Sequence, residues 1–272
     1  MKRQYENFSI SIEESEDRLT AFPSQFQKEW MLGRALREFA DDLEHLDTLS
    51  RHLVPGVERP PIGGGWESSA AAQSAKELVI QGQQVMQSWE QPLMQRMATA
   101  AASRGGDVLE VGFGMGISAS FILEAGVRSY TVIECNDGVI ESFERWRQRY
   151  PQTNIRLVRG RWQDVAQQLG DYDGILFDTY PLSQEEYLRN EVNGRAYSHA
   201  GEFFPLAAAK LRPGGVFTYF SCEIDSLSRG HERLLLRHFE SFEVSVVRGL
   251  TPPERCQYWW ADSMVMVKAT RT

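Results

Sequence analysis

Short apolar runs alternate along residues 108–220 with segments in which apolar residues recur every three or four positions. The runs predict buried strands, and the three-and-four spacing predicts amphipathic helices. The expected strands are 108–111, 130–133, 155–158, 174–177 and 216–220. The expected helices are 118–124, 139–148, 202–211 and 228–239. Alternation of this kind is typical of an α/β fold, in which a parallel sheet carries crossover helices on both faces.

Two more strands, 242–247 and 264–268, follow without a helix between them. The segment that connects them contains Pro252-Pro253, which interrupts regular structure. We therefore expect these two strands to pair antiparallel at the end of the sheet. A further helix is expected upstream, from about residue 76 to residue 97, because apolar residues follow a helical spacing there: Val79, Val85, Met86, Trp89, Leu93 and Met97.

The first 60 residues differ from the rest because they carry a long helical pattern. Between residues 25 and 54 the apolar positions follow spacings of three, four and seven: Leu32, Leu36, Phe39, Leu43, Leu46 and Leu53. This stripe fits a helix that packs on its own domain, and it also fits a helix that pairs with its copy in a homodimer. Pro55-Gly56 and the segment 60–65 then break regular structure. We predict a helical extension with a linker over 1–65 and one domain over 66–272.

The composition is that of a folded, acidic chain. Of 272 residues, 42% are hydrophobic and 24% are charged, which is enough apolar content for a sizeable core. The formal charge of −8 argues against nucleic acid as a partner and suits a neutral or cationic small substrate. Cys135, Cys222 and Cys256 lie far apart, which predicts no disulfide framework and fits a reducing cytosol. The chain opens without an apolar leader and has no run of 18 apolar residues, so we expect a cytoplasmic protein outside the membrane.

A glycine motif with the spacing GxGxG joins the first predicted strand to its helix, at Gly112, Gly114 and Gly116. Glycines at such a turn let the backbone approach a ligand closely. The spacing differs from the GxGxxG of dinucleotide pyrophosphate loops, and no P-loop lysine follows. Glu134 ends the next strand, where a carboxylate can reach the two ribose hydroxyls of a nucleoside cofactor. Together the two motifs indicate S-adenosylmethionine.

Two acidic residues from separate segments are candidates for binding a cation. Asp178 follows the fourth predicted strand, at the sheet edge where ligands of open α/β sheets bind. Glu90 follows the apolar helical face upstream. Two carboxylates match the forked donors of a guanidinium, although each could also be a structural or surface acid.

The chain from Trp66 to about Thr270 resembles the guanidinoacetate N-methyltransferase family, whose members methylate guanidino groups with S-adenosylmethionine. The segment 160–164 and Gly116 also resemble the related arginine δ-nitrogen methyltransferases. The resemblance does not reach residues 1–60. The matching segments are Val85-Met86 with Trp89-Glu90 and Pro92, 101–103 with 108–115, 134–139, 173–176 with 178–182, and Leu211 with 213–216 and 218–219.

The resemblance implies a class I methyltransferase (Rossmann-like) fold with a seven-stranded sheet. It implies that Glu90 and Asp178 grip the guanidinium as catalytic residues, with Asp178 taking the proton. It also implies that Trp66 lies on an N-terminal lid and that Tyr180 contributes to the substrate site. The cofactor-binding residues expected from it and from the motifs are Met86, Met94, Glu110, Gly112, Phe113, Gly114, Met115, Gly116, Ile117, Ser118, Glu134, Cys135, Asn136, Arg161, Trp162 and Asp178.

The chain departs from the family pattern after Thr218-Tyr219. There the family carries a Thr-Ser pair that receives the carboxylate of guanidinoacetate, whereas this chain continues through Glu223 and Asp225. Two acids would repel that carboxylate and attract an α-ammonium group. This favours free L-arginine or an arginine-like metabolite as the substrate, with Glu223 and Asp225 as binding residues. The alternative is that Glu223 points to solvent and the loop merely differs.

Other functions remain open at this point. The transferase could act on guanidinoacetate or on a protein-bound arginine, or the chain could be a silent cofactor-binding protein that recruits a partner through residues 25–54. No metal is expected, because the histidines are scattered without metal-ligand spacing: His45, His52, His199, His231 and His238. Serine hydrolase chemistry is disfavoured because the chain has no GxSxG elbow.

Overall fold

The computed structural model describes residues 60–187, 199–221, 223 and 225–271. The chain divides into two units, Met1–Gly56 and Val57–Thr272, and the described residues belong to the second. The expected N-terminal helix and its pairing in a homodimer lie outside the described residues, and the predicted boundary after residue 65 stays a prediction. No helix in the described ranges combines the length and the apolar character that crossing a membrane requires.

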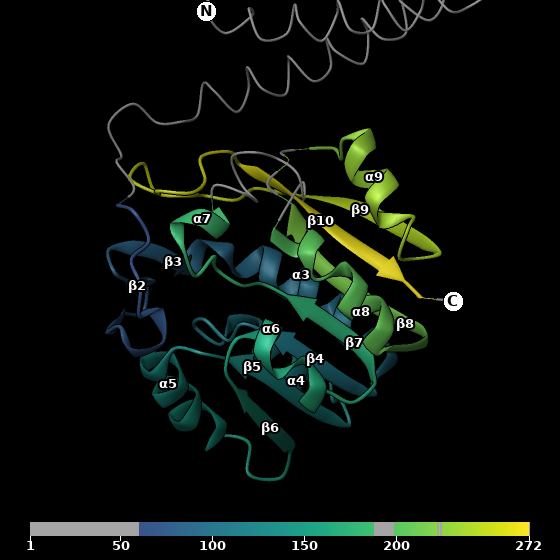
Figure 1. Ribbon diagram of the computed structural model, residues 1–272, viewed down its shortest axis with the longest axis horizontal. Helices are drawn as coiled ribbons and strands as arrows, with labels where there is room; N and C mark the ends of the chain where they lie inside the picture. Colours follow the sequence, from purple (N-terminus) through teal and green to yellow (C-terminus); the bar gives the residue numbers. More distant parts are fainter. Residues whose placement is uncertain (1–59, 188–198, 222, 224, 272) are drawn as a thin grey trace, which may run out of the picture. The chain divides into compact units, whose positions relative to one another are not determined.

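A seven-stranded sheet forms the centre of the domain, in the order β6-β5-β4-β7-β8-β10-β9 (Figure 1). The first five strands in this order run parallel, and β10 pairs antiparallel with both β8 and β9. The expected seven-stranded class I methyltransferase sheet is confirmed, with its antiparallel end. The strands are β4 (Asp107–Val111), β5 (Ser129–Glu134), β6 (Asn154–Arg159), β7 (Tyr172–Phe177), β8 (Leu211–Ser221), β9 (Ser241–Arg248) and β10 (Ser263–Thr270).

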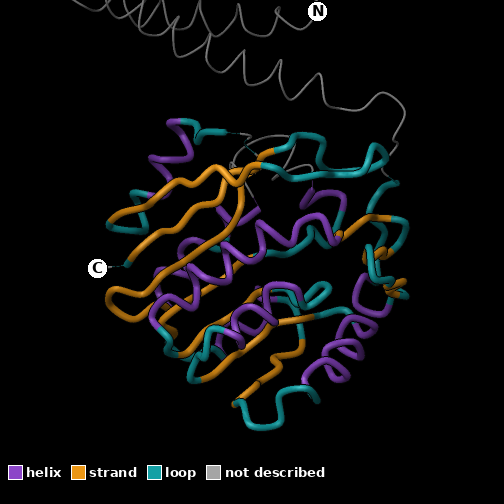
Figure 2. Tube along the Cα trace, turned by 180° about the vertical axis from the view of Figure 1, so that it is seen from behind, coloured by secondary structure: helices purple, strands orange, loops and turns teal. Residues whose placement is uncertain are grey.

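Helices cover both faces of this sheet (Figures 1 and 2). One apolar cluster joins one face to α3, α4 and α5, for example through Met97, Ile122 and Phe143. The other cluster joins the second face to α6, α8 and α9. The four helices expected along residues 118–239 are confirmed. The helices are α3 (Gln91–Ala101), α4 (Ile117–Glu124), α5 (Asp137–Arg147), α6 (Trp162–Val165), α7 (Gln184–Tyr187), α8 (Phe204–Lys210) and α9 (Arg229–Leu235).

The prediction of one helix from residue 76 to residue 97 is wrong in its first half. A separate antiparallel sheet of three strands stands there: β1 (Ala71–Gln73), β2 (Glu77–Ile80) and β3 (Gln83–Gln87). Gln81 and Gly82 both have positive φ, 53° and 75°, which is the geometry of a two-residue hairpin turn. The turn reverses the chain, so the helix α3 starts only at Gln91, after the 3₁₀ turn η2 (Ser88–Glu90).

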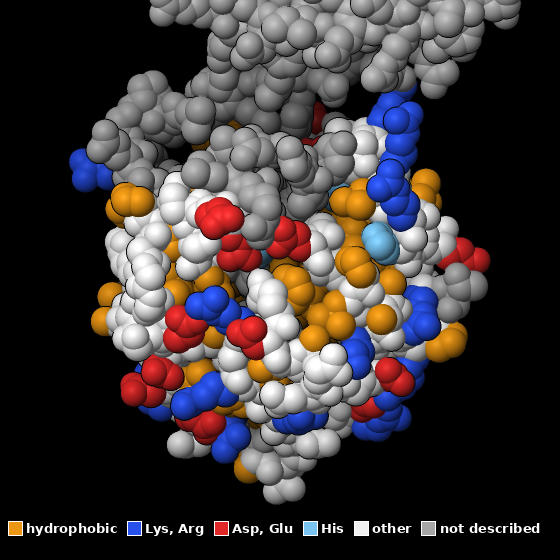
Figure 3. Space-filling view, in the orientation of Figure 1, with side chains coloured by type: hydrophobic (Ala, Val, Ile, Leu, Met, Phe, Trp, Pro, Cys, Tyr) orange, Lys and Arg blue, Asp and Glu red, His pale blue; other side chains and the backbone are white. Residues whose placement is uncertain are grey.

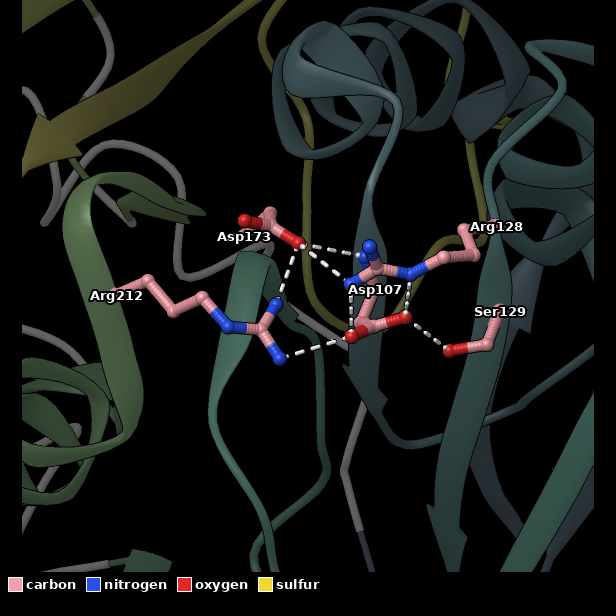
Figure 4. Close-up of polar contacts among 5 residues, drawn as sticks. All are labelled: Asp107, Arg128, Ser129, Asp173 and Arg212. Atoms are coloured by element: carbon pink, nitrogen blue, oxygen red, sulfur yellow. Dashed lines mark hydrogen bonds and ion pairs between the residues drawn. The ribbon is translucent and has the colours of Figure 1, made fainter.

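An ion-pair network ties together the strands at their amino ends (Figure 4). Asp107 at the start of β4 accepts hydrogen bonds from Arg128, from Ser129 and from Arg212. Arg212 also pairs with Asp173 of β7 at 2.5 Å. The network therefore links β4, β5, β7 and β8 at the edge opposite to the one that carries the candidate site.

Acidic and basic side chains are interspersed over the face of the domain that Figure 3 draws. That nucleic acid is not a partner stays a prediction from the net charge of −8.

Candidate active site

The glycine motif forms the turn between β4 and α4. Gly112, Gly114 and Gly116 have φ values of 90°, 54° and 73°, a region that residues with a side chain rarely adopt. A Cβ atom at Gly112 would collide with the carbonyl oxygen of Asp178. The turn is therefore tight and pressed against the end of β7, and the close approach of a ligand to it stays a prediction.

Glu134 ends β5 beside this turn. Its carboxyl group accepts hydrogen bonds from the backbone N–H groups of Phe113, Cys135 and Asn136 at 2.8–3.0 Å. Burial raises the pKa of Glu134, and these backbone donors oppose the rise. The carboxyl group is thus held in one orientation next to the glycine turn, where a nucleoside cofactor is expected.

Met86 and Met94, both predicted to bind the cofactor, come from different elements. Met86 belongs to β3, and its sulfur accepts a hydrogen bond from the backbone N–H of Met115 at 3.3 Å. A Cβ atom at Gly114 would lie only 2.8 Å from the same sulfur. Met94 is fully buried in α3, within the core. Met86 therefore covers the glycine turn, while Met94 packs in the core cluster.

Glu110 lies beneath the turn and is fully buried. Its carboxyl group accepts hydrogen bonds from the hydroxyl groups of Ser118 and Tyr130. Burial raises its pKa to about 8, although both hydroxyl groups lower it. Two of the predicted cofactor residues, Glu110 and Ser118, are therefore bonded to each other.

Glu90 and Asp178, the two acids predicted to grip the guanidinium, lie close enough for the charge of one to act on the other. Both carboxyl groups are buried, and the negative charge of Asp178 acts on Glu90. Burial, followed by this repulsion, raises the pKa of Glu90 to about 8, and burial alone raises the pKa of Asp178 to about 7. Glu90 Oε1 accepts hydrogen bonds from the backbone N–H of Gln87 at 2.6 Å and from the hydroxyl of Tyr258 at 2.5 Å. A cation bound between the two acids would favour their ionised forms and lower both pKa values.

Two buried oxygen atoms beside the glycine turn lack partners among the described residues: Asp178 Oδ2 and Thr179 Oγ1. A buried oxygen without a hydrogen bond costs free energy, and a ligand that donates to it removes this cost. Thr179 was not predicted as a site residue. These two oxygens mark the end of β7 as a place built to contact a ligand.

Trp66 and Tyr180 form a stacked pair over the carboxyl ends of the strands. Their ring centroids lie 5.2 Å apart with an interplanar angle of 7°, and Trp66 is buried in the 3₁₀ turn η1 (Trp66–Ser68). The side chain of Asn136, which also caps α5, donates to the carbonyl oxygens of Trp66 and Ser69. The predicted lid residue is thus tied to the strand end that carries Glu134.

Arg161 and Trp162, both predicted to bind the cofactor, have partners within the protein. Arg161 forms an ion pair with Glu67, which raises the pKa of the Arg161 guanidinium. The ring of Trp162 packs edge-on against Phe177 and Phe203, at centroid distances of 6.2 and 5.2 Å. Their contact with the cofactor stays a prediction.

Glu223 is buried, so the alternative in which it points to solvent does not hold. Its carboxyl group accepts hydrogen bonds from Ser221 at 2.8 Å, from the backbone N–H of Ser228 at 2.6 Å and from Nδ1 of His231 at 2.7 Å. Burial raises the pKa of Glu223, but His231, Ser228 and Ser221 together lower it overall. Asp225, the second predicted acid, is exposed.

Tyr258 is a site residue that the sequence reasoning missed. It lies between β9 and β10, and its ring stacks on Trp89 at a centroid distance of 5.9 Å while its hydroxyl donates to Glu90. The sequence feature that could have indicated Tyr258 is the run Gln257-Tyr258-Trp259-Trp260. Three consecutive large aromatic residues are unusual in a connection without regular structure, where functional residues are often found.

One group of possible metal ligands exists in the described part of the chain. Oxygen and nitrogen atoms of Glu186, His199 and Glu202 lie within 4.8 Å of one another. Glu186 already accepts hydrogen bonds from Leu182 N and from Gln163, and His199 and Glu202 have further interactions of their own. The group is therefore accounted for by bonds within the protein.

The comparisons with known proteins agree with this geometry. A family model described as guanidinoacetate N-methyltransferase matches residues 63–231. Protein arginine N-methyltransferase 2 of Saccharomyces cerevisiae is 26% identical over 149 residues, which are 50% of this chain and 32% of that protein. The protein of the same name from Yarrowia lipolytica is 30% identical over 156 residues, 53% of this chain and 30% of that one. The match thus spans about a third of the length of these relatives.

Among solved structures, spermidine synthase from Thermotoga maritima is similar with a TM-score of 0.52 and 14% identity, covering 75% of this chain and 72% of that one. A spermidine synthase in complex with a transition state analogue has a TM-score of 0.53 and 15% identity, covering 75% and 73%. At such identities the similarity shows the shared fold.

Proposed function

This chain belongs to the guanidinoacetate N-methyltransferase family, and from that premise we propose that it methylates a guanidino nitrogen of a small amino-acid substrate, free L-arginine or an arginine-like metabolite. The observation that carries the proposal is the pair of buried carboxyl groups of Glu90 and Asp178 beside the glycine turn. Their charge suits one flat cation, because a guanidinium offers two edges of N–H donors to two carboxylates.

S-adenosylmethionine is the cofactor, and when bound it supplies an electrophilic methyl group carried on a sulfonium. The residues that fit it are the turn from Gly112 to Gly116, where side chains have no room, and the oriented carboxyl group of Glu134. The buried Thr179 Oγ1, which has no partner in the described chain, and Met86 above the turn would complete the contacts.

Glu90 and Asp178 would accelerate the reaction by orienting the guanidinium and by accepting its proton. A guanidinium stays protonated at neutral pH because its pKa exceeds about 12, so a nitrogen gains a lone pair only as its proton leaves. Glu90 and Asp178 would orient one nitrogen toward the methyl carbon, and alignment of this kind is worth on the order of 7–11 kcal/mol. Asp178, with a pKa of about 7, is a base matched to neutral pH and would take the proton as the C–N bond forms.

The specificity for arginine would come from the segment after β8. A buried, ionised Glu223 would offer a negative charge to an α-ammonium group, whereas the carboxylate of guanidinoacetate would be repelled. Within the protein, Glu223 Oε2 bonds to Ser221 and His231, and Oε1 accepts from the backbone N–H of Ser228, so an α-ammonium group would share these oxygens with the existing donors.

The proposal is tested with a panel of guanidino compounds and labelled S-adenosylmethionine. The panel includes L-arginine, guanidinoacetate, argininosuccinate and agmatine. We expect label in the guanidino product and a higher rate with arginine than with guanidinoacetate. The reverse ranking would overturn the assignment of Glu223, and no transfer to any compound would overturn the proposed reaction.

A protein-bound arginine is the second candidate, favoured by the name of the curated relatives, protein arginine N-methyltransferase 2. The burial of Glu90 and of the Oδ2 atom of Asp178, together with the Trp66–Tyr180 stack, favours the small substrate because a peptide would need an open groove. Mass spectrometry of arginine-containing peptides and of free arginine, incubated in the same mixture, separates the two. Methylated peptide without methylated arginine would replace the first candidate with the second.

A further inference from the structure

The connection between β9 and β10 reaches the β2–β3 hairpin, far away in the chain. The backbone N–H of Gln257 donates to Gln84 Oε1 at 2.8 Å, and the backbone N–H of Gln84 donates to Gln257 Oε1 at 3.1 Å. Gln257 Nε2 also donates to the carbonyl oxygen of Gly82 at 3.3 Å. These reciprocal bonds hold Tyr258, the next residue, against the segment that carries Glu90.

Tyr258 contacts that segment in two ways. Its ring stacks on Trp89, with an interplanar angle of 27°, and its hydroxyl donates to Glu90 Oε1 at 2.5 Å. The backbone N–H of Gln87 donates to the same oxygen at 2.6 Å. Both hydrogen bonds that the Glu90 carboxyl group accepts within the described chain thus end on Oε1, which leaves Oε2 as the acceptor for a ligand.

We propose that Tyr258 is a positioning residue, which holds Glu90 by Oε1 so that Oε2 is presented to the guanidinium of the substrate. This inference rests on the proposed function, because it takes a guanidino compound as the ligand of Glu90. A carboxyl group between η2 and α3 could otherwise rotate about its side-chain bonds, and each freely rotating bond would cost binding free energy when the substrate orders it.

The charges around Glu90 support this role. Asp178 on β7 repels its charge, and Cys256 lies on the same connection as Tyr258 with a thiol whose pKa is raised, first by burial. The hydroxyl of Tyr258 is the strongest of the groups that lower the pKa of Glu90. Burial and the charge of Glu90 raise the pKa of Tyr258 itself, so the phenol keeps its proton and remains a donor. Tyr258 therefore favours the ionised form of Glu90, which is the form that binds a cation.

The test is Tyr258→Phe, which removes the donor and keeps the ring on Trp89. We expect kcat/KM for the guanidino substrate to fall roughly ten- to a hundredfold, mostly through KM, as for a lost hydrogen bond to a charged group. The acid limb of the kcat/KM pH profile should move to higher pH, because Glu90 then binds its proton more tightly. The dissociation constant of S-adenosylmethionine should stay within about twofold, because Tyr258→Phe leaves the glycine turn and Glu134 unaltered. Tyr150→Phe, at a tyrosine packed on Trp146, is the matched control.

The outcomes separate the two proposals. If the unaltered protein methylates no guanidino compound, the proposed function fails. If it is active and Tyr258→Phe changes neither KM nor the acid limb, the role of Tyr258 fails while the function stands. If Tyr258→Phe does not fold, as judged by lost cofactor binding, Gln84→Ala is used instead, because it frees the connection without altering Tyr258. The same rise in KM and shift of the acid limb are then expected, and their absence overturns the inference.

Discussion

Glu90, ahead of α3, lies within range of the charge of Asp178, which follows β7. The charge of Asp178 adds to burial in raising the pKa of Glu90 to about 8, while burial raises the pKa of Asp178 to about 7. Neither acid has an ion-pair partner among the described residues. The protein therefore keeps both groups in a state that is unfavourable without a ligand and that a cation would relieve.

Binding of the guanidinium should release protons in a pH-dependent way. Both pKa values are raised, so the ligand-free site loses stability as the pH rises through 7 and 8, and a cation restores it by favouring the ionised forms. About two protons should leave per arginine bound at pH 6 and almost none at pH 9. Isothermal titration calorimetry with the inert product S-adenosylhomocysteine present, in two buffers of different ionisation enthalpy, measures this number. Equal proton release at both pH values would contradict the coupling.

Asp178→Asn should remove turnover and leave cofactor binding measurable. The amide keeps the size of the side chain but cannot accept the proton, and a lost general base costs roughly 10²–10⁴-fold in rate. Labelled methyl transfer gives the rate, and calorimetry gives the affinity for S-adenosylmethionine. Asp171→Asn, at an exposed residue just before β7, is the matched control. Near-normal turnover in Asp178→Asn would refute the role as base.

The strands and helices of the main sheet could be predicted because each has a strong local signal. The buried strands are short apolar runs between turns, and their order follows from the alternation with helices. The segment of β2 and β3 misled the periodicity analysis because its apolar residues also match a helical spacing. The deciding feature was the pair Gln81-Gly82, whose positive φ angles make the hairpin turn, and only glycine there is an obvious turn residue.

The candidate site was predictable only where its residues belong to local sequence motifs. Glu90, Glu134 and Asp178 stand at ends of elements, where sequence motifs report position directly. Tyr258 reaches the site through bonds between Gln257 and Gln84, which are 173 residues apart, and no local pattern records such a contact. Trp162 was predicted as a cofactor residue from a sequence motif, and its ring packs against Phe177 and Phe203, a contact that the motif does not reveal.

Gly112→Ala should abolish the cofactor site by forcing the glycine turn away from β7. Left-handed backbone costs an alanine about 1–2 kcal/mol, and the collision with the Asp178 carbonyl adds an overpacking cost of about 1–3 kcal/mol. Gly126→Ala is the control, because Gly126 also has positive φ (77°) but open space around a Cβ atom. Urea unfolding and cofactor binding are compared for both variants. Equal effects would mean that backbone strain alone, and not the contact with Asp178, makes Gly112 necessary.

Glu223→Gln should lower the preference for arginine over guanidinoacetate. The substitution removes the buried negative charge, so KM for arginine should rise roughly tenfold, as for a lost charge-assisted hydrogen bond, while KM for guanidinoacetate stays level or falls. The ratio of kcat/KM for the two compounds is the measured quantity. Asp225→Asn, at the exposed neighbouring acid, should change this ratio little. If Glu223→Gln leaves this ratio unchanged, Glu223 only forms structural hydrogen bonds with Ser221 and His231 and does not select the substrate.

Asp107→Asn should destabilise the domain at neutral pH, and the loss should shrink in acid. The hydrogen bond from Arg128, with those from Ser129 and Arg212, lowers the pKa of Asp107 below its ordinary value of 3.8 against the opposing effect of burial. Its stabilisation is therefore present above pH 3.8 and is lost as the pH falls through the lowered pKa. Because the Asp107 side chain is 19% exposed and holds two arginines, we expect a loss of about 1–3 kcal/mol at pH 7. Urea unfolding at pH 7 and at pH 3 measures it. Asp137→Asn, in an exposed pair with Arg159 at 3.9 Å, is the control and should lower the free energy of unfolding by less than about 0.5 kcal/mol. An equal loss of unfolding free energy in both variants would mean that the Asp107 network stabilises the domain no more than a surface ion pair does.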